Sequence, residues 1–150
     1  MTSTAASDFH AQPAAAALRA AFGGSPISSP ALVTGGLSGA RLFRFEAEGR
    51  PWLLRLEGPR DAFRDPHRWH VCMRLAAEAG IAPPVRYADA QSGVCIMGFV
   101  EGGALAEGYS GSRPAMIAAA GDLVRRLHGT PAFPPLVDYM DGMAAVIAQL

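Results

Sequence analysis

The chain has 150 residues, enough for one domain of ordinary size with a substantial hydrophobic core. Half of its residues are hydrophobic, and thirteen cations balance thirteen anions, which argues against a disordered charged tail and against nucleic-acid binding. No stretch approaches the roughly 20 apolar residues that a membrane span needs, and the N-terminus, with Asp8 and His10, does not resemble a secretory signal. We therefore expect a cytoplasmic protein.

The residue types that are missing limit the chemistry. All thirteen cations are arginine, and the chain contains neither lysine nor asparagine. A mechanism that requires either side chain therefore cannot be completed by these residues alone. Cys72 and Cys95 lie inside apolar periodic segments, without the close company that paired metal ligands need. We expect both to be reduced core residues.

The first thirty residues predict a short helix and a loop. Residues 1–10 are small and polar, and we expect them to be loosely held. The alanine-rich segment 12–22 has Pro13 near its start and Gly23 after its end, a pattern typical of a helix. Glycine, serine and proline then predict a loop.

Residues 32–57 predict three strands. The first strand leads into the turn TGGLSGA, whose glycines let the backbone approach a ligand closely. Residues 42–47 alternate as in a half-buried strand, and residues 48–50 reverse the chain. In the strand that follows, Arg55 shares a face with Leu53 and Glu57. A glycine turn over a strand with one inward cation is a plausible place to hold phosphate.

The rest of the chain predicts one helix, two strands and then helices. The first helix begins at Asp65-Pro66 and ends at Gly80; the strands cover residues 85–90 and 93–100. A helix from Pro114 to Gly129 and another from Val137 onward follow, the last reaching Leu150 without a cap, so the chain looks cut off mid-domain. Because most links between strands are too short for parallel crossovers, we expect an α+β fold built on a five-stranded antiparallel sheet with one packed helix, followed by helices.

The glycine turn allows other interpretations. The phosphate-loop pattern of NTPases is absent because no GK[ST] follows the glycines. The segment also resembles the TGxxxGxG turn of short-chain dehydrogenases, which bind a nicotinamide dinucleotide. However, the last glycine of that pattern falls on Arg41, strands rather than a helix are expected next, and the lysine of that active site does not exist here. A third possibility is that Gly35, Gly36 and Gly39 only shape a hairpin turn.

The order of the predicted elements and four motifs resemble the N-terminal lobe of the aminoglycoside phosphotransferase and choline kinase family. The motifs are GGLSGARLFRF, WLLRL, AAEAGIAPPVRYADA and IMGFVEGGAL, and the resemblance covers about Leu32 to Gly129. It implies a protein-kinase-like fold. It divides the chain into an N-terminal helix and loop (1–30), a nucleotide-binding N-lobe with the interlobe hinge at its end (31–103) and the incomplete start of a helical C-lobe (104–150).

The resemblance also implies an ATP site. The loop over the phosphates would use backbone N–H groups and the Ser38 hydroxyl, and Arg55 stands where kinases place a lysine. Met97 precedes the expected hinge, where the backbone of Val100 would hydrogen-bond adenine. The expected ATP-binding residues are Gly35, Gly36, Leu37, Ser38, Gly39, Arg55, Met97, Gly98, Phe99 and Val100.

Two positions depart from the family pattern. The loop usually has Ser-Asn where Ser38-Gly39 stand, so one polar contact is missing. The helix before the fourth strand normally offers a glutamate in its middle to pair the strand cation, but His70 and Val71 occupy that region and Glu78 lies near its end. Arg55 must therefore pair elsewhere or be positioned by phosphate contact alone.

The family's catalytic loop, of the form HGDxxxxN, is not in this chain. His128-Gly129 is followed by threonine and proline, and we interpret it as a helix end. We therefore expect no catalytic residue and no metal ligand here, with the ligands for Mg²⁺ beyond residue 150. The other histidines, His10, His67 and His70, form no converging cluster, and we expect solvated or second-layer groups.

The leading hypothesis is that this is the ATP-binding portion of a small-molecule kinase. The full-length enzyme would transfer the γ-phosphoryl group of ATP to a hydroxyl of an aminoglycoside, a choline-like amino-alcohol or a related metabolite, with ATP and Mg²⁺ as cofactors. Its partners would be a nucleotide and a small-molecule acceptor, with no nucleic acid and no membrane. The alternative is a non-catalytic kinase-like binding or scaffold module, and a dehydrogenase fragment is the least favoured.

Overall fold

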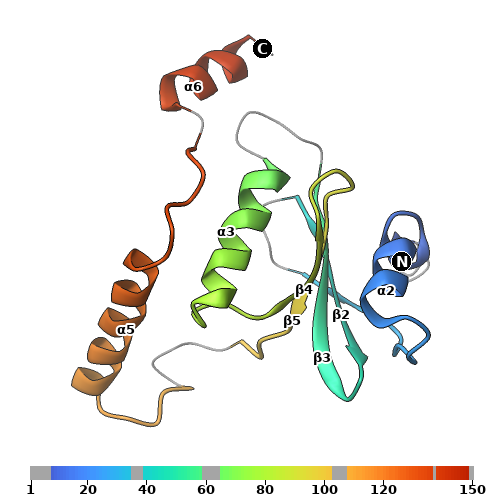
Figure 1. The fold of residues 1–150 in the computed structure, drawn as a ribbon, viewed down its shortest axis with the longest axis horizontal. Helices are drawn as coiled ribbons and strands as arrows, with labels where there is room; N and C mark the ends of the chain where they lie inside the picture. The colour runs from blue at the N-terminus through green and yellow to red at the C-terminus, as the bar shows by residue number, and fades with distance from the viewer. Residues whose placement is uncertain (1–7, 35–38, 59–64, 103–107, 137, 149–150) are drawn as a thin grey trace.

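The structure is a computed structural model that describes residues 8–34, 39–58, 65–102, 108–136 and 138–148 (Figure 1). The elements are α2 (Ala14–Phe22), β1 (Ala31–Val33), β2 (Arg41–Ala47), β3 (Arg50–Leu56), α3 (Pro66–Glu78), β4 (Val85–Asp89), β5 (Val94–Gly98), α5 (Arg113–His128) and α6 (Tyr139–Ile147). Five strands and two of the helices make up the first part of the described chain, and α5 and α6 follow.

The five strands form one antiparallel sheet in the order β1-β2-β3-β5-β4, which confirms the expected α+β fold class. Directly opposed residues share a face of such a sheet. Leu42, Arg55 and Cys95 are opposed across β2, β3 and β5, and Arg44, Leu53 and Met97 form the next row. These two rows belong to the face on which α3 lies (Figure 1).

The hairpin between β2 and β3 is tighter than the sequence indicated. Ala47 and Arg50 are already paired, so only Glu48 and Gly49 form the turn. Both have positive φ, 53° and 71°, as the favoured two-residue hairpin turns require. Arg50 therefore begins β3 instead of contributing to the reversal.

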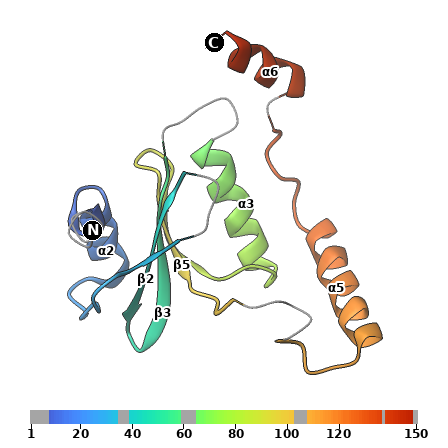
Figure 2. The same cartoon turned by 180° about the vertical axis from the view of Figure 1, so that it is seen from behind.

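The main hydrophobic core lies between the sheet and α2, on the face opposite α3 (Figure 2). Phe43, Phe45 and Leu54 are at most 1% exposed there. Phe9 is also fully buried, and its ring lies 5.7 Å from that of Phe43 and 5.4 Å from that of Phe45. The expectation that residues 1–10 are loosely held is therefore wrong for Phe9, because three aromatic rings meet at this end of the core.

Helix α3 covers the other face of the sheet (Figures 1 and 2). Its first turn is capped as expected, with the His67 N–H donating to Asp65 Oδ1 at 2.9 Å. It ends at Glu78, and Gly80 follows with a φ of +66°, a conformation that glycine adopts most readily. Arg126 of α5 donates to the carbonyl oxygen of Ala79, so a later helix satisfies the end of α3.

Helices α5 and α6 lie beyond α3 (Figure 1). The α5 boundaries match the expected helix, with Ser112 as N-cap and Gly129 after the last turn. Helix α6 begins at Tyr139 because Asp138 caps it, and the expected start at Val137 is outside the described residues. Apolar side chains of both helices are exposed, among them Ile117 (61%) and Met140 (70%). None of the described helices is long and apolar enough to cross a membrane.

Candidate functional site

The expected phosphate loop is described only at its end. Gly35, Gly36, Leu37 and Ser38 are outside the described residues, whereas Gly39 has a φ of +69°, a conformation in which glycine is strongly favoured. The segment after the turn is β2, a strand of seven residues. A dinucleotide-binding turn must open a helix at this point, so the dehydrogenase interpretation is wrong.

Arg55 finds its ionic partner within its own strand segment. Its Nε lies 2.5 Å from Glu57 Oε1, and its Nη2 donates to Glu57 Oε2 at 3.1 Å. The Arg55 side chain is 18% exposed and that of Glu57 11%, so the pair is largely removed from water. A forked pair of this kind matches the planar guanidinium to the carboxylate. It answers how Arg55 is paired when the helix offers no central glutamate.

Helix α3 contributes an aromatic ring to the same cation. The Arg55 Cζ lies 4.7 Å from the centroid of the Trp69 ring, within the range of a cation–π contact. Because Asp65 fixes the start of α3 and Trp69 lies one turn later, the helix presents this ring to β3. Strand and helix therefore hold the guanidinium together, the strand through charge and the helix through stacking.

His70 is the buried polar side chain of this region, 8% exposed. Neither of its ring nitrogens has a hydrogen-bond partner in the described part of the chain. Burial lowers the pKa of His70 below 6.5, although the negative charges of Glu57 and Asp89 act in the opposite direction. We expected a solvated or second-layer group, and the solvated alternative is wrong for His70, because its ring is buried beside that of Trp69.

The two cysteines differ in their surroundings. Both are free thiols, but Cys95 is 1% exposed whereas Cys72 on α3 is only half-buried. Burial raises the pKa of the Cys95 thiol to about 12, with the nearby Arg55 opposing the rise. The expectation of a core cysteine therefore holds for Cys95 but not for Cys72.

Met97 and the three residues of the expected hinge, Gly98, Phe99 and Val100, follow one another at the end of β5 and just beyond it. Met97 is buried (6% exposed), and its row places it one row from Arg55 on the same face of the sheet. The N–H of Gly98 donates to the carbonyl of Pro84 at 2.9 Å, and that of Phe99 to the carbonyl of Pro51 at 3.1 Å. Val100 is 65% exposed, and no described residue hydrogen-bonds to its backbone.

Two residues of this region were missed by sequence reasoning. Glu57 could have been found as the partner of Arg55, because alternation along β3 had already placed both residues on one face. Arg44 could not: its Cζ lies 5.4 Å from the Phe99 ring centroid and its Nη2 3.4 Å from Glu101 Oε1, contacts between distant segments. Arg44 thereby joins β2 to the chain just after β5.

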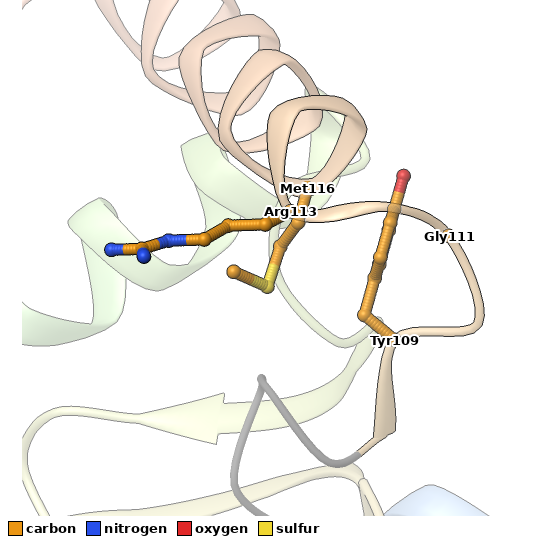
Figure 3. Close-up of a pocket in the computed structure, with 4 residues that line it drawn as sticks. All are labelled: Tyr109, Gly111, Arg113 and Met116. Carbon is orange, nitrogen blue, oxygen red and sulfur yellow. The ribbon is translucent and has the colours of Figure 1, made fainter.

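A separate cavity of about 460 Å³ lies at the start of α5, lined by Tyr109, Gly111, Arg113 and Met116. Figure 3 shows the Arg113 guanidinium pointing away from the Tyr109 ring. Of the expected ATP-binding residues that the structure describes, none lines this cavity. Across the described ranges, no group of three or more His, Cys, Asp or Glu side chains could hold a metal ion.

Comparisons with known proteins agree with this geometry. Residues 31–150 match the model of the phosphotransferase enzyme family. A crystal structure of a choline/ethanolamine kinase family protein from Mesorhizobium loti superposes with a TM-score of 0.53 at 28% sequence identity. The match covers 89% of this chain and 40% of that one, so the chain spans less than half the length of this relative. The search of curated proteins found no match.

The family match covers most of the chain, including the sheet, α3 and the segment after β5. The similar solved structure is described as a choline/ethanolamine kinase family protein. The antiparallel sheet with its covering helix in this chain agrees with a kinase-like lobe. This chain therefore belongs to the phosphotransferase enzyme family, within the aminoglycoside phosphotransferase and choline kinase group.

Proposed function

We propose that this chain is the ATP-binding portion of a small-molecule kinase. The whole enzyme transfers the γ-phosphoryl group of ATP to a hydroxyl of an aminoglycoside, a choline-like amino-alcohol or a related metabolite. The observation that carries the proposal is the placement of Arg55, a cation held on the same sheet face as Met97, one row away from it. A fixed positive charge opposite Cys95, one row from Met97, suits a nucleotide whose phosphates lie near Arg55 and whose adenine lies near the end of β5.

The residues present fit a nucleotide in three respects. The exposed Val100 offers backbone groups for the adenine edge, and the largely buried Met97 offers only the small exposed part of its apolar side chain to the ring face. Glu57 occupies the Nε side of the Arg55 guanidinium, and no described residue hydrogen-bonds to the Nη1 amino group, which the proposal assigns to a phosphate oxygen. Residues 35–39 supply the loop over the phosphates in this proposal, through backbone N–H groups and the Ser38 hydroxyl.

The described residues do not fit a metal site, so no step of the mechanism is derived through Mg²⁺. In the proposal, its ligands and the catalytic loop lie beyond residue 150. ATP, when bound, supplies the phosphoryl group, and this chain binds and orients it. Residues 31–103 form the nucleotide-binding lobe, residues 1–30 the preceding helix and loop, and residues 104–150 the start of the helical lobe. The free thiols of Cys72 and Cys95 support a cytoplasmic location.

The proposal is tested by titrating the chain with ATP in a calorimeter. We expect binding that Arg55→Ala weakens by about ten- to a hundredfold, because a charge-assisted contact to phosphate contributes about 1.5–3 kcal/mol. Arg50→Ala is the matched control, since Arg50 is an exposed arginine at the other end of β3. An absence of ATP binding, or equal affinity in wild type and Arg55→Ala, would contradict the proposal.

A non-catalytic kinase-like binding module is the second candidate. The observation that favours it is on α3, where Trp69 rather than a carboxylate contacts Arg55. The gene's reading frame after Leu150 separates the two candidates. An HGDxxxxN block followed by an acidic motif, together with ATP consumption in the presence of choline or an aminoglycoside, supports the kinase. A stop codon at that point supports the module.

A further inference from the structure

Glu57 lies at a position where the neighbouring turn between β4 and β5 restricts its backbone and side chain. It follows the last residue of β3, yet its N–H donates to the carbonyl of Gly93 in the turn between β4 and β5 at 2.9 Å. A Cβ on Gly93 would lie 3.1 Å from the Glu57 Cβ, so only glycine leaves this side chain comfortable room. The Glu57 backbone and Cβ are thus held by a turn that comes long after them in the chain, and the carboxylate extends from this held position to Arg55.

We propose that Glu57 positions Arg55 for phosphate binding, in the role that the family resemblance gives to a glutamate of the covering helix. The inference rests on the proposed function, since it concerns the same cation and the same ligand. Glu57 is a positioning residue: it contacts Arg55 and not the nucleotide. Trp69 completes the arrangement from α3.

The geometry of the pair favours positioning over competition. Glu57 accepts from Nε and Nη2, which form one edge of the guanidinium. No residue in the described ranges hydrogen-bonds to the Nη1 amino group, so carboxylate and phosphate can bind the guanidinium at once in this proposal. The Trp69 ring faces the same guanidinium and limits its rotation about the carboxylate. Charge from one side and stacking from another leave the cation few orientations.

Placing the carboxylate on the strand changes what the helix controls. An ion pair between a strand and a helix forms or breaks as the helix moves, whereas Arg55 and Glu57 are two residues apart on one strand segment. Their pairing therefore does not depend on where α3 lies. The helix acts on Arg55 only through the Trp69 ring, a contact that tolerates small shifts because stacking is less directional than a forked hydrogen bond.

The test compares ATP with adenosine in wild type, Glu57→Gln, Arg55→Ala and the double variant, by calorimetry. We expect Glu57→Gln to weaken ATP binding about five- to tenfold and to leave adenosine binding unchanged, because the phosphates are the only part of the nucleotide that contacts Arg55 in this proposal. In the Arg55→Ala background, Glu57→Gln should have no further effect, since there is no cation left to position. Glu78→Gln is the control with the same change of charge, at an exposed site near the end of α3.

Each other result contradicts a specific part of the proposal. If wild type binds ATP and Glu57→Gln binds it equally or more tightly, Glu57 does not position Arg55. If Glu57→Gln weakens ATP and adenosine alike, its role is to hold the fold. Glu57→Asp, which keeps the charge, covers the case in which Glu57→Gln does not fold, and is expected to retain more ATP affinity than Arg55→Ala. If wild type binds no ATP, the proposed function itself fails.

Discussion

The Arg44 guanidinium lies over the Phe99 ring, with the Arg44 Cζ 5.4 Å from the ring centroid, so β2 holds the segment that leaves β5. The Arg44 side chain also reaches Glu46 at 3.3 Å and Glu101 at 3.4 Å. The Arg44 side chain thus contacts Glu46 on its own strand, and Phe99 and Glu101 in the segment after β5. The position of Val100 next to Phe99 makes this contact relevant to any ligand bound there.

Arg44→Ala is expected to loosen residues 99–101. We expect faster amide hydrogen exchange there and about two- to fivefold weaker binding of both ATP and adenosine, because an exposed cation–π contact contributes about 0.5–1 kcal/mol. Arg86→Ala is the matched control, since it removes a similar contact with Phe22 on the opposite face. Unchanged exchange at residues 99–101 would show that Arg44 does not hold this segment.

Gly80→Ala is expected to destabilise the protein by about 1–2 kcal/mol, since φ is +66° there and an added Cβ would lie 2.8 Å from Arg126 Nη2. Denaturant unfolding measures the effect. Gly49→Ala isolates the backbone strain, because its φ is +71° and nothing lies within 4 Å of the added Cβ. Gly24→Ala, with open space and no positive φ, should be nearly neutral. Equal values for Gly80→Ala and Gly49→Ala would mean that Arg126 moves aside freely.

The burial of His70 makes the free energy of unfolding depend on pH. Because burial lowers its pKa below 6.5, the unfolded chain binds the proton more readily than the folded chain between the two pKa values. The free energy of unfolding should therefore fall as the pH drops from above 6.5 toward the folded-state pKa of His70, and this contribution levels off below that value.

Unfolding by urea at a series of pH values checks this dependence. His70→Leu should show a smaller decrease in the free energy of unfolding over that pH range than wild type, because it removes the buried titrating group. His128→Gln, at an exposed position on α5, should behave like wild type. An identical pH profile in wild type and His70→Leu would show that protonation of His70 does not oppose folding.

The two thiols should react with iodoacetamide at very different rates. At pH 8 we expect Cys72 to be alkylated in the folded protein, whereas Cys95 is protected by its burial and by a pKa of about 12. Mass spectrometry of the modified chain assigns the site, and Cys72→Ser should leave almost no rapid reaction. Both thiols should react in denaturant. Rapid alkylation of Cys95 without denaturant would mean that the β3–β5 region opens readily.

The sheet could be predicted from the sequence because alternation, turns and caps are local signals. The hairpin at Glu48-Gly49 and the caps at Asp65 and Gly80 appear in the structure close to where the sequence put them. Phe9 was missed because a lone apolar residue among small polar ones has no period to reveal it. Its burial depends on Phe43 and Phe45, which are distant in the chain.

In the candidate site too, features set by local patterns could be predicted, whereas contacts between distant segments could not. The place of Arg55 on β3 and the exit at Gly98 follow from strand patterns. The contact of Arg55 with Trp69 depends on how α3 lies across the sheet, and no pattern within α3 shows it. The burial of His70 was missed for the same reason: its helical spacing put Trp69, Cys72 and Met73 toward the sheet, whereas the packed helix turns His70 inward.

The order of the strands has a consequence for how the chain reaches this fold. All neighbouring pairs in β1-β2-β3 and in β4-β5 are consecutive in sequence, whereas β3 and β5 are separated by α3 and β4. Closing that long connection has an entropic cost that short hairpins avoid, and pairings of this kind slow folding. We therefore expect the β1-β2-β3 part and the β4-β5 hairpin to form first and to pair with each other along β3 and β5. Arg55 and Cys95 are opposed where β3 pairs with β5, and we expect them to come together only when this slower pairing forms.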